Sequence, residues 1–176
     1  MPNKIFRKKV SYQDAVSGFI TVTIKQIDDD WWKISEAFED AGIIPPNNFE
    51  EVHKLEFFLA LCSLEVISIF SIYDKKQASL IYDLILYHVS NFADEAGSYS
   101  KETIRDIYVP AIDYCIKHNF SFMNEVSQTL LYKLEIKFDD LENQEYSLLK
   151  LTTISEILTN YYGKWVLINQ KYKIKD

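Results

Sequence analysis

The chain has 176 residues, 48% of them hydrophobic, with only four glycines, four prolines and two cysteines. This length fits a single domain with its own core, and the low glycine and proline content argues against long loops or disorder. Cys62 and Cys115 lie within apolar helical patterns, so we expect free thiols in a cytoplasmic protein rather than a secreted disulfide scaffold. The basic start of the chain lacks the apolar stretch that is typical of a signal peptide.

The net charge of −7 is unevenly distributed. The net charge is +4 in residues 1–9 and +3 in residues 164–176, so the intervening body carries a net charge of −14. An acidic body repels nucleic acid and attracts basic proteins. The basic ends could meet and touch nucleic acid or a membrane, but pairing with the body's own carboxylates is favoured. We expect one domain over residues 1–176, with a basic arm at 1–10 and the apolar, basic tail at 164–176 docked on the body.

The first predicted helix begins at Ser11, which forms a capping box with Asp14, and its apolar spacing continues to Ile27. The three aspartates at residues 28–30 are expected to end this helix and to cap a second one that reaches Ala41. Carboxylates stabilise the positive end of a helix dipole, which is the reason for this prediction.

The longest apolar stretch covers residues 49–72 and is predicted to be a central, buried helix, capped by Asn47 or Asn48. It is polar on one side for two turns and then apolar on nearly every side, which is typical of a helix enclosed by other helices or by lipid. A membrane span needs roughly 20 apolar residues. The uninterrupted part, residues 57–72, is shorter and contains Glu65, so a buried core helix is favoured.

Three more helices are predicted in the following stretch. Asp74 is expected to cap a helix that ends at Gly97, Ser100 to open the next, and Ser121 to open a third. Pro110 falls inside the apolar pattern that starts at Ser100. It either kinks one helix or occupies the first position of a second.

The last long helix is expected to be capped by Asp139 or Asp140 and to end at Gly163. The count is about seven helices with short polar links, which predicts an all-α fold: a single globular bundle around the central helix 49–72. Helix pairs of roughly 40–45 residues also fit a short α-solenoid-like arrangement. No signature recurs at a fixed period, so the bundle is favoured.

The most unusual surface is predicted between residues 28 and 51, where eight carboxylates accompany only Lys33. Trp31 and Trp32 are adjacent and cannot both face the core of a helix, so one should be partly exposed among these charges. Exposed aromatic residues beside fixed charges are favoured as anchors in protein interfaces, and a solvated helix face is the simpler alternative. The predicted partner-binding residues are Asp28, Asp29, Asp30, Trp32, Glu36, Glu39, Asp40, Glu50 and Glu51.

An enzyme is the alternative interpretation. Glu50 and His53 form Glu-x-x-His on a helix, which is half of the ligand pattern of a di-iron bundle. Neither His88 nor His118 has a glutamate three residues before it, so we expect no metal, no cofactor and no catalytic residue. A metal-binding or other enzyme built on Glu50, His53 and His88 remains the alternative, and a helical scaffold or regulatory protein is a further one.

In general character the chain is similar to nuclease inhibitors and toxin-immunity proteins, because it is small, acidic and without a catalytic motif. No motif maps onto a named family. The sequence therefore predicts a cytoplasmic protein-binding module, not an enzyme. Its expected partner is a protein with a basic surface, such as a toxin nuclease domain, and contacts with nucleic acid or a membrane are not expected.

Overall fold

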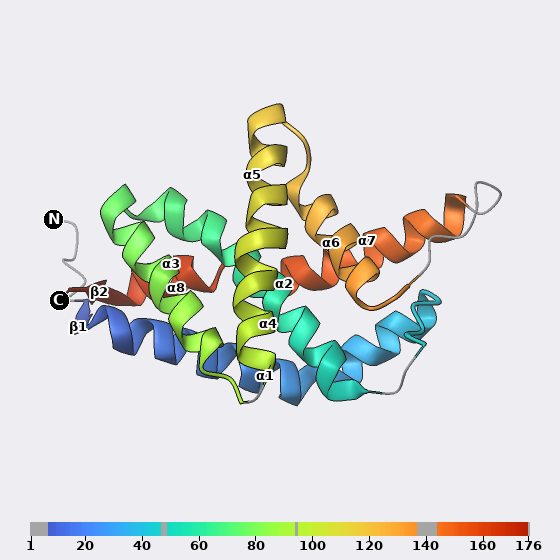
Figure 1. Cartoon of the computed structure of the whole chain (residues 1–176), viewed down its shortest axis with the longest axis horizontal. Helices are drawn as coiled ribbons and strands as arrows, with labels where there is room; N and C mark the ends of the chain where they lie inside the picture. The colour runs from blue at the N-terminus through green and yellow to red at the C-terminus, as the bar shows by residue number, and fades with distance from the viewer. Residues whose placement is uncertain (1–6, 47–48, 94, 137–143, 176) are drawn as a thin grey trace, which may run out of the picture.

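The computed structural model describes residues 7–46, 49–93, 95–136 and 144–175 (Figure 1). In chain order its elements are β1 Lys8–Val10, α1 Tyr12–Asp40, α2 Glu50–Ile72, α3 Lys75–Ser90, α4 Ala96–Glu102, the π-helix η1 Thr103–Tyr108, α5 Val109–His118, α6 Phe122–Lys133, α7 Gln144–Tyr161, α8 Lys164–Lys171 and β2 Tyr172–Ile174. The predicted all-α class is confirmed, since helices make up 81% of the structure. The predicted number of helices is slightly too high. Counting adjoining helical segments together gives six helices in the described part of the chain.

Helix α2 is the predicted buried central helix. From Glu56 to Val66 every side chain is buried, and α1, α3, η1, α6 and α8 pack around it (Figure 1). Among the described residues it is the one helix long and apolar enough to cross a membrane, and 72% of its most apolar window lies buried inside the protein. A helix that is apolar all round and enclosed by other helices is a core helix.

Helix α1 is a single helix of 29 residues, which corrects the predicted break at residues 28–30. Ile27, Trp31 and Ile34 are buried on either side of the aspartates, so the apolar face continues without interruption. Aspartate is only a moderately poor helix former. Packing of this face on α2 and α7 therefore outweighs the capping preference from which the break was predicted.

Several predicted helix ends are confirmed. Ser11, Asp74 and Ser121 are N-caps, and each side chain accepts a hydrogen bond of 3.0–3.2 Å from the backbone N–H three residues later. Asn119 and Gly163 follow α5 and α7 in the left-handed conformation that ends a helix. Four other predicted caps lie outside the described residues: Asn47, Asn48, Asp139 and Asp140.

The region after α3 differs from the prediction. Helix α3 ends at Ser90 and α4 already begins at Ala96, so Gly97 does not end a helix and Ser100 does not open one. Both residues are buried inside α4. A Cβ atom at Gly97 would lie 2.4 Å from the carbonyl oxygen of Ser90. Gly97 is therefore required by the close approach of two backbones, not by a turn.

Pro110 lies inside one continuous helix made of α4, η1 and α5. The π-helical turns of η1 come directly before it, and the N–H of Val109 bonds the carbonyl of Ile104, five residues back. Proline lacks an N–H and crowds the carbonyl four residues before it in an α-helix. A π-helical segment changes which carbonyls are paired, so the helix continues past the proline without splitting.

The two ends of the described chain lie side by side (Figure 1). Strands β1 and β2 form a parallel sheet in which Val10 lies opposite Ile174. Helix α8 precedes β2 and inserts Trp165, fully buried, into the core. The ring of Trp165 lies 5.6 Å from that of Phe19 and 6.1 Å from that of Tyr73. The tail thus contributes both a strand and a core side chain.

Glu65, the carboxylate in the middle of α2, caps helix α8. Its two oxygens accept hydrogen bonds from the backbone N–H groups of Lys164 at 2.6 Å and Trp165 at 3.3 Å. The first N–H groups of a helix have no partner within the helix, and a carboxylate there also faces the positive end of the dipole. Burial raises the pKa of Glu65, and these N–H groups oppose that shift. Glu65, the carboxylate within the apolar stretch of α2, therefore attaches helix α8 to the core.

A second buried carboxylate, Glu56, lies where α2 meets α4 and η1. The hydroxyl of Tyr99 donates a hydrogen bond to it, and the amine of Lys133 lies 3.3 Å from that hydroxyl. The other oxygen of Glu56 and the hydroxyl of Tyr108 are buried without a hydrogen-bond partner among the described residues. Burial raises the pKa of Glu56, while Tyr99 and Lys133 act in the opposite direction.

This environment predicts a pH-dependent effect of Glu56→Gln. Because the pKa of Glu56 is higher in the folded than in the unfolded chain, its contribution to stability is fully present below the unfolded pKa and is lost as the pH rises through the folded pKa. The glutamine variant has no such group. Its unfolding free energy, measured with denaturant between pH 4 and pH 8, should therefore rise relative to that of the wild type as the pH increases.

Glu36→Gln removes a carboxylate from an exposed position of α1 and is the matched control, because exposed substitutions change stability little. A constant difference between Glu56→Gln and the wild type across this pH range would contradict the prediction.

Candidate protein-binding surface

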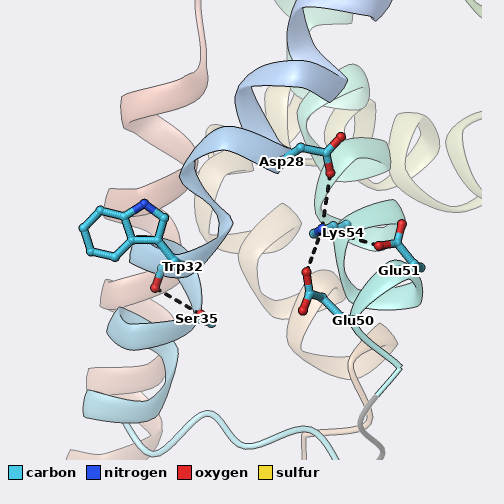
Figure 2. Close-up of polar contacts among 6 residues, drawn as sticks. All are labelled: Asp28, Trp32, Ser35, Glu50, Glu51 and Lys54. Atoms are coloured by element: carbon cyan, nitrogen blue, oxygen red, sulfur yellow. Dashed lines mark hydrogen bonds and ion pairs between the residues drawn. The ribbon is translucent and has the colours of Figure 1, made fainter.

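The two adjacent tryptophans separate as predicted, because consecutive helical residues point about 100° apart. Trp31 is buried, and its ring packs edge-on against Phe38 and Phe57 at 6.2 and 6.5 Å. Trp32 is 62% exposed and projects away from α1 into solvent (Figure 2). The amine of Lys33 lies 5.3 Å from its ring. Helix α1 therefore holds one core tryptophan and one surface tryptophan.

Trp32 is surrounded by carboxylates along the outer face of α1, which we define by the exposed residues Asp29, Trp32, Glu36, Glu39 and Asp40. Asp29 pairs with Lys25 at 2.6 Å. Glu36, Glu39 and Asp40 form no ion pair with any residue that the structure describes. The last turn of α1 also contains no basic residue, although cations are the stabilising charges at a helix C-terminus. Negative charge is thus concentrated near the C-terminus of α1, where it does not stabilise the helix.

A second acidic group, which we name the Lys54 cluster, joins α1 to the start of α2. The amine of Lys54 lies 2.6 Å from Glu50, 3.3 Å from Asp28 and 3.4 Å from Glu51 (Figure 2). The hydrogen bond to Glu50 is the main reason that the pKa of Lys54 lies well above its usual value. One cation shared by three carboxylates leaves the cluster negative and links the side chains of α1 and α2.

Asp30 lies on another side of α1 from the other predicted residues. It pairs with Lys33 at 2.8 Å and accepts a hydrogen bond from Tyr161 of α7, and these two contacts lower its pKa. Burial raises the pKa of Tyr161 to about 12, with Asp30 acting in the same direction. Asp30 therefore takes part in packing of α1 against α7.

The structure thus divides the nine predicted residues into three groups. The outer face of α1 takes five of them, the Lys54 cluster takes Asp28, Glu50 and Glu51, and Asp30 stands apart. Trp32 points away from the Lys54 cluster (Figure 2). Lys54 was missed from the sequence, although its spacing of three and four residues from Glu51 and Glu50 indicates ion pairs within α2. Its reach to Asp28 depends on the fold.

The structure does not bring His88 of the alternative enzyme site to Glu50 and His53, which lie one turn apart on α2. His88 contacts the side-chain amide of Gln13 at 2.8 Å, whereas Glu50 lies beside Asp28 through Lys54. Gln13 and Asp28 are fifteen residues, or about 22 Å, apart along the axis of α1. Partial burial lowers the pKa of His53, against the effect of Glu50. Within the described ranges, no group of three or more His, Cys, Asp or Glu residues is placed to hold a metal ion.

Comparison with known proteins gives no relative from which to transfer a role. No protein-family model matches the chain, and no curated protein or solved structure matches it. The interpretation of the surface therefore depends on its geometry and charge alone.

Proposed function

We propose that the chain is a protein-binding module whose outer face of α1 covers a basic surface on a partner protein. The observation that carries the proposal is Trp32, a large aromatic side chain that is 62% exposed. It shares the outer face of α1 with three carboxylates that form no ion pair with a described residue: Glu36, Glu39 and Asp40. Tryptophan is strongly enriched among the residues that dominate binding energy at protein interfaces. The surrounding charge adds selection for a partner of opposite sign and raises the association rate.

The partner class follows from the sign and density of the charge. Nucleases that act on DNA or RNA carry basic surfaces, because they neutralise the phosphate backbone of their substrate. An acidic helix face bound at such a surface takes the place of phosphates and blocks access without any catalytic step. We therefore propose an inhibitory, toxin-immunity type of function in the cytoplasm, exerted by occlusion.

The test reverses charge on the outer face of α1 without disturbing the Lys54 cluster. A toxin and the protein that neutralises it are produced together, so the candidate partner to assay is the product of the gene that adjoins the one for this chain. We expect Glu36→Lys combined with Glu39→Lys to lower the association rate at least tenfold at low salt and less at high salt, because added salt screens the attraction. Stopped-flow fluorescence measures the association rate at each salt concentration, and it also gives the dissociation rate.

The matched control carries equal charge reversal elsewhere: Asp83→Lys combined with Glu102→Lys, both exposed positions on α3 and α4. This control should lose much less of the association rate. Trp32→Ala should act mainly on dissociation, with a loss of about 2 kcal/mol or more in binding free energy if Trp32 is the anchor. The proposal fails if the adjoining gene encodes no basic protein that binds, or if both charge-reversal pairs weaken binding equally.

A further inference from the structure

A groove of about 480 Å³ opens between the start of α1, α8 and the two strands. Figure 1 shows these four elements side by side. This volume lies within the range of small-molecule sites, which are concave and mostly apolar. Its apolar lining comes from both helices and β1: Val10, Ala15, Phe19, Val22, Leu167 and Ile168. Phe19 also packs on the buried Trp165, so the floor of the groove is continuous with the core.

Gly18 lies in α1 and lines this groove. No neighbouring heavy atom lies within 4 Å of the place where a Cβ atom would be. This is the opposite of Gly97, whose Cβ would meet the backbone of α3. Glycine weakens a helix interior relative to alanine, and neither backbone conformation nor packing requires it at position 18. A side chain here would occupy the groove, and glycine leaves it open.

The charges at the rim favour a negative ligand. The charged side chains that line the groove are three lysines and one carboxylate: Lys8, Lys164, Lys171 and Asp14. Asp14 is engaged with the N-cap Ser11, and the amine of Lys164 donates to the carbonyl of Tyr161 at 2.7 Å. Lys8 and Lys171 form no ion pair with any described residue. Residues 1–6 of the chain include the cation Lys4, so their charge does not favour them as the occupant of this groove.

We propose that this groove binds a single-chain amphiphile with an anionic head, of the class of free long-chain carboxylates. The alkyl chain lies along Gly18 against Phe19 and Leu167, and the carboxylate lies beside Lys8 and Lys171. An apolar floor provides the binding free energy, and the two lysine amines select the head-group charge. This site is separate from the outer face of α1 and does not depend on the function proposed for it.

The test is isothermal titration of the full chain with dodecanoate below the concentration at which it forms micelles. We expect saturable binding of one molecule and at least tenfold weaker binding of dodecyltrimethylammonium, which has the same chain and the opposite charge. Gly18→Leu should weaken dodecanoate binding at least tenfold without lowering Tm, because its side chain enters open space. Lys8→Gln combined with Lys171→Gln should weaken dodecanoate binding and remove the preference over the ammonium compound.

Gly18→Ala is the matched control for Gly18→Leu. It should raise Tm by about 2–4 °C, since alanine favours the helix, while leaving dodecanoate affinity within about threefold. The proposal is overturned if the wild type gives no saturable binding, or if Gly18→Leu binds as the wild type does. It is also overturned if binding requires removal of residues 1–6, or if the chain binds phosphatidylglycerol vesicles but not monomeric dodecanoate. Should Gly18→Leu fail to fold, the paired lysine variant decides the outcome.

Discussion

Leu61→Asp is expected to abolish the cooperative folded state of the whole chain. Leu61 is 1% exposed in the buried half of α2, which five other elements contact. The substitution removes a core side chain and buries a charge without a partner, and each effect costs several kcal/mol. Domains of this size are stable by only about 5–15 kcal/mol. Circular dichroism on heating and the dispersion of amide NMR signals measure the loss.

Val52→Asp is the matched control for this substitution, because Val52 lies on the same helix and is exposed. It introduces the same charge into the same helix and should change stability by less than about 0.5 kcal/mol. Leu61→Ala should fall between the two variants, with a loss of about 2–5 kcal/mol. A cooperative transition of Leu61→Asp near the wild-type Tm would show that α2 is not the core helix.

Trp165→Ala is expected to lower the unfolding free energy by about 3–5 kcal/mol, the usual result of removing a buried tryptophan side chain. Trp165 is fully buried against Phe19 and Tyr73, and its backbone N–H bonds Glu65. Loss of the side chain should release α8 and β2, and β1 then loses its paired strand. Amide hydrogen exchange should therefore accelerate in Lys164–Lys171 and in both strands before the rest of the chain.

Trp32→Ala supplies the matched control, since it deletes the same side chain from an exposed position. Its stability should remain within about 0.5 kcal/mol of the wild type. If both tryptophan variants lose equal stability, the tail is not attached through Trp165. If the amides of β1 are equally protected from hydrogen exchange in Trp165→Ala and wild type, pairing of the strands does not depend on docking of α8.

The sequence predicted the features that depend on neighbouring residues. The buried α2 follows from an apolar stretch, and the N-caps Ser11, Asp74 and Ser121 follow from capping residue types placed just before apolar helical patterns. The separation of Trp31 from Trp32 follows from helix geometry alone. These features need no knowledge of which helices meet.

The features that the sequence did not predict depend on contacts between distant segments. Helix α1 continues through residues 28–30 because α2 and α7 pack along it, and no local pattern contains that information. Glu65 looked like an interruption of α2, whereas its role as the cap of α8 depends on Lys164, 99 residues later. Lys54 likewise reaches Asp28 only because α1 and α2 cross there.

Pairing of β1 with β2 sets the order in which this chain can finish folding during translation. Lys8 pairs with Tyr172, and the ribosome adds about 5–20 residues per second, so the first strand is complete roughly 10–30 s before its partner emerges. Through that interval Phe19 has no Trp165 to stack on and Glu65 has no helix to cap. The nascent chain therefore presents an incomplete core to chaperones and proteases until residues 164–174 have left the exit tunnel.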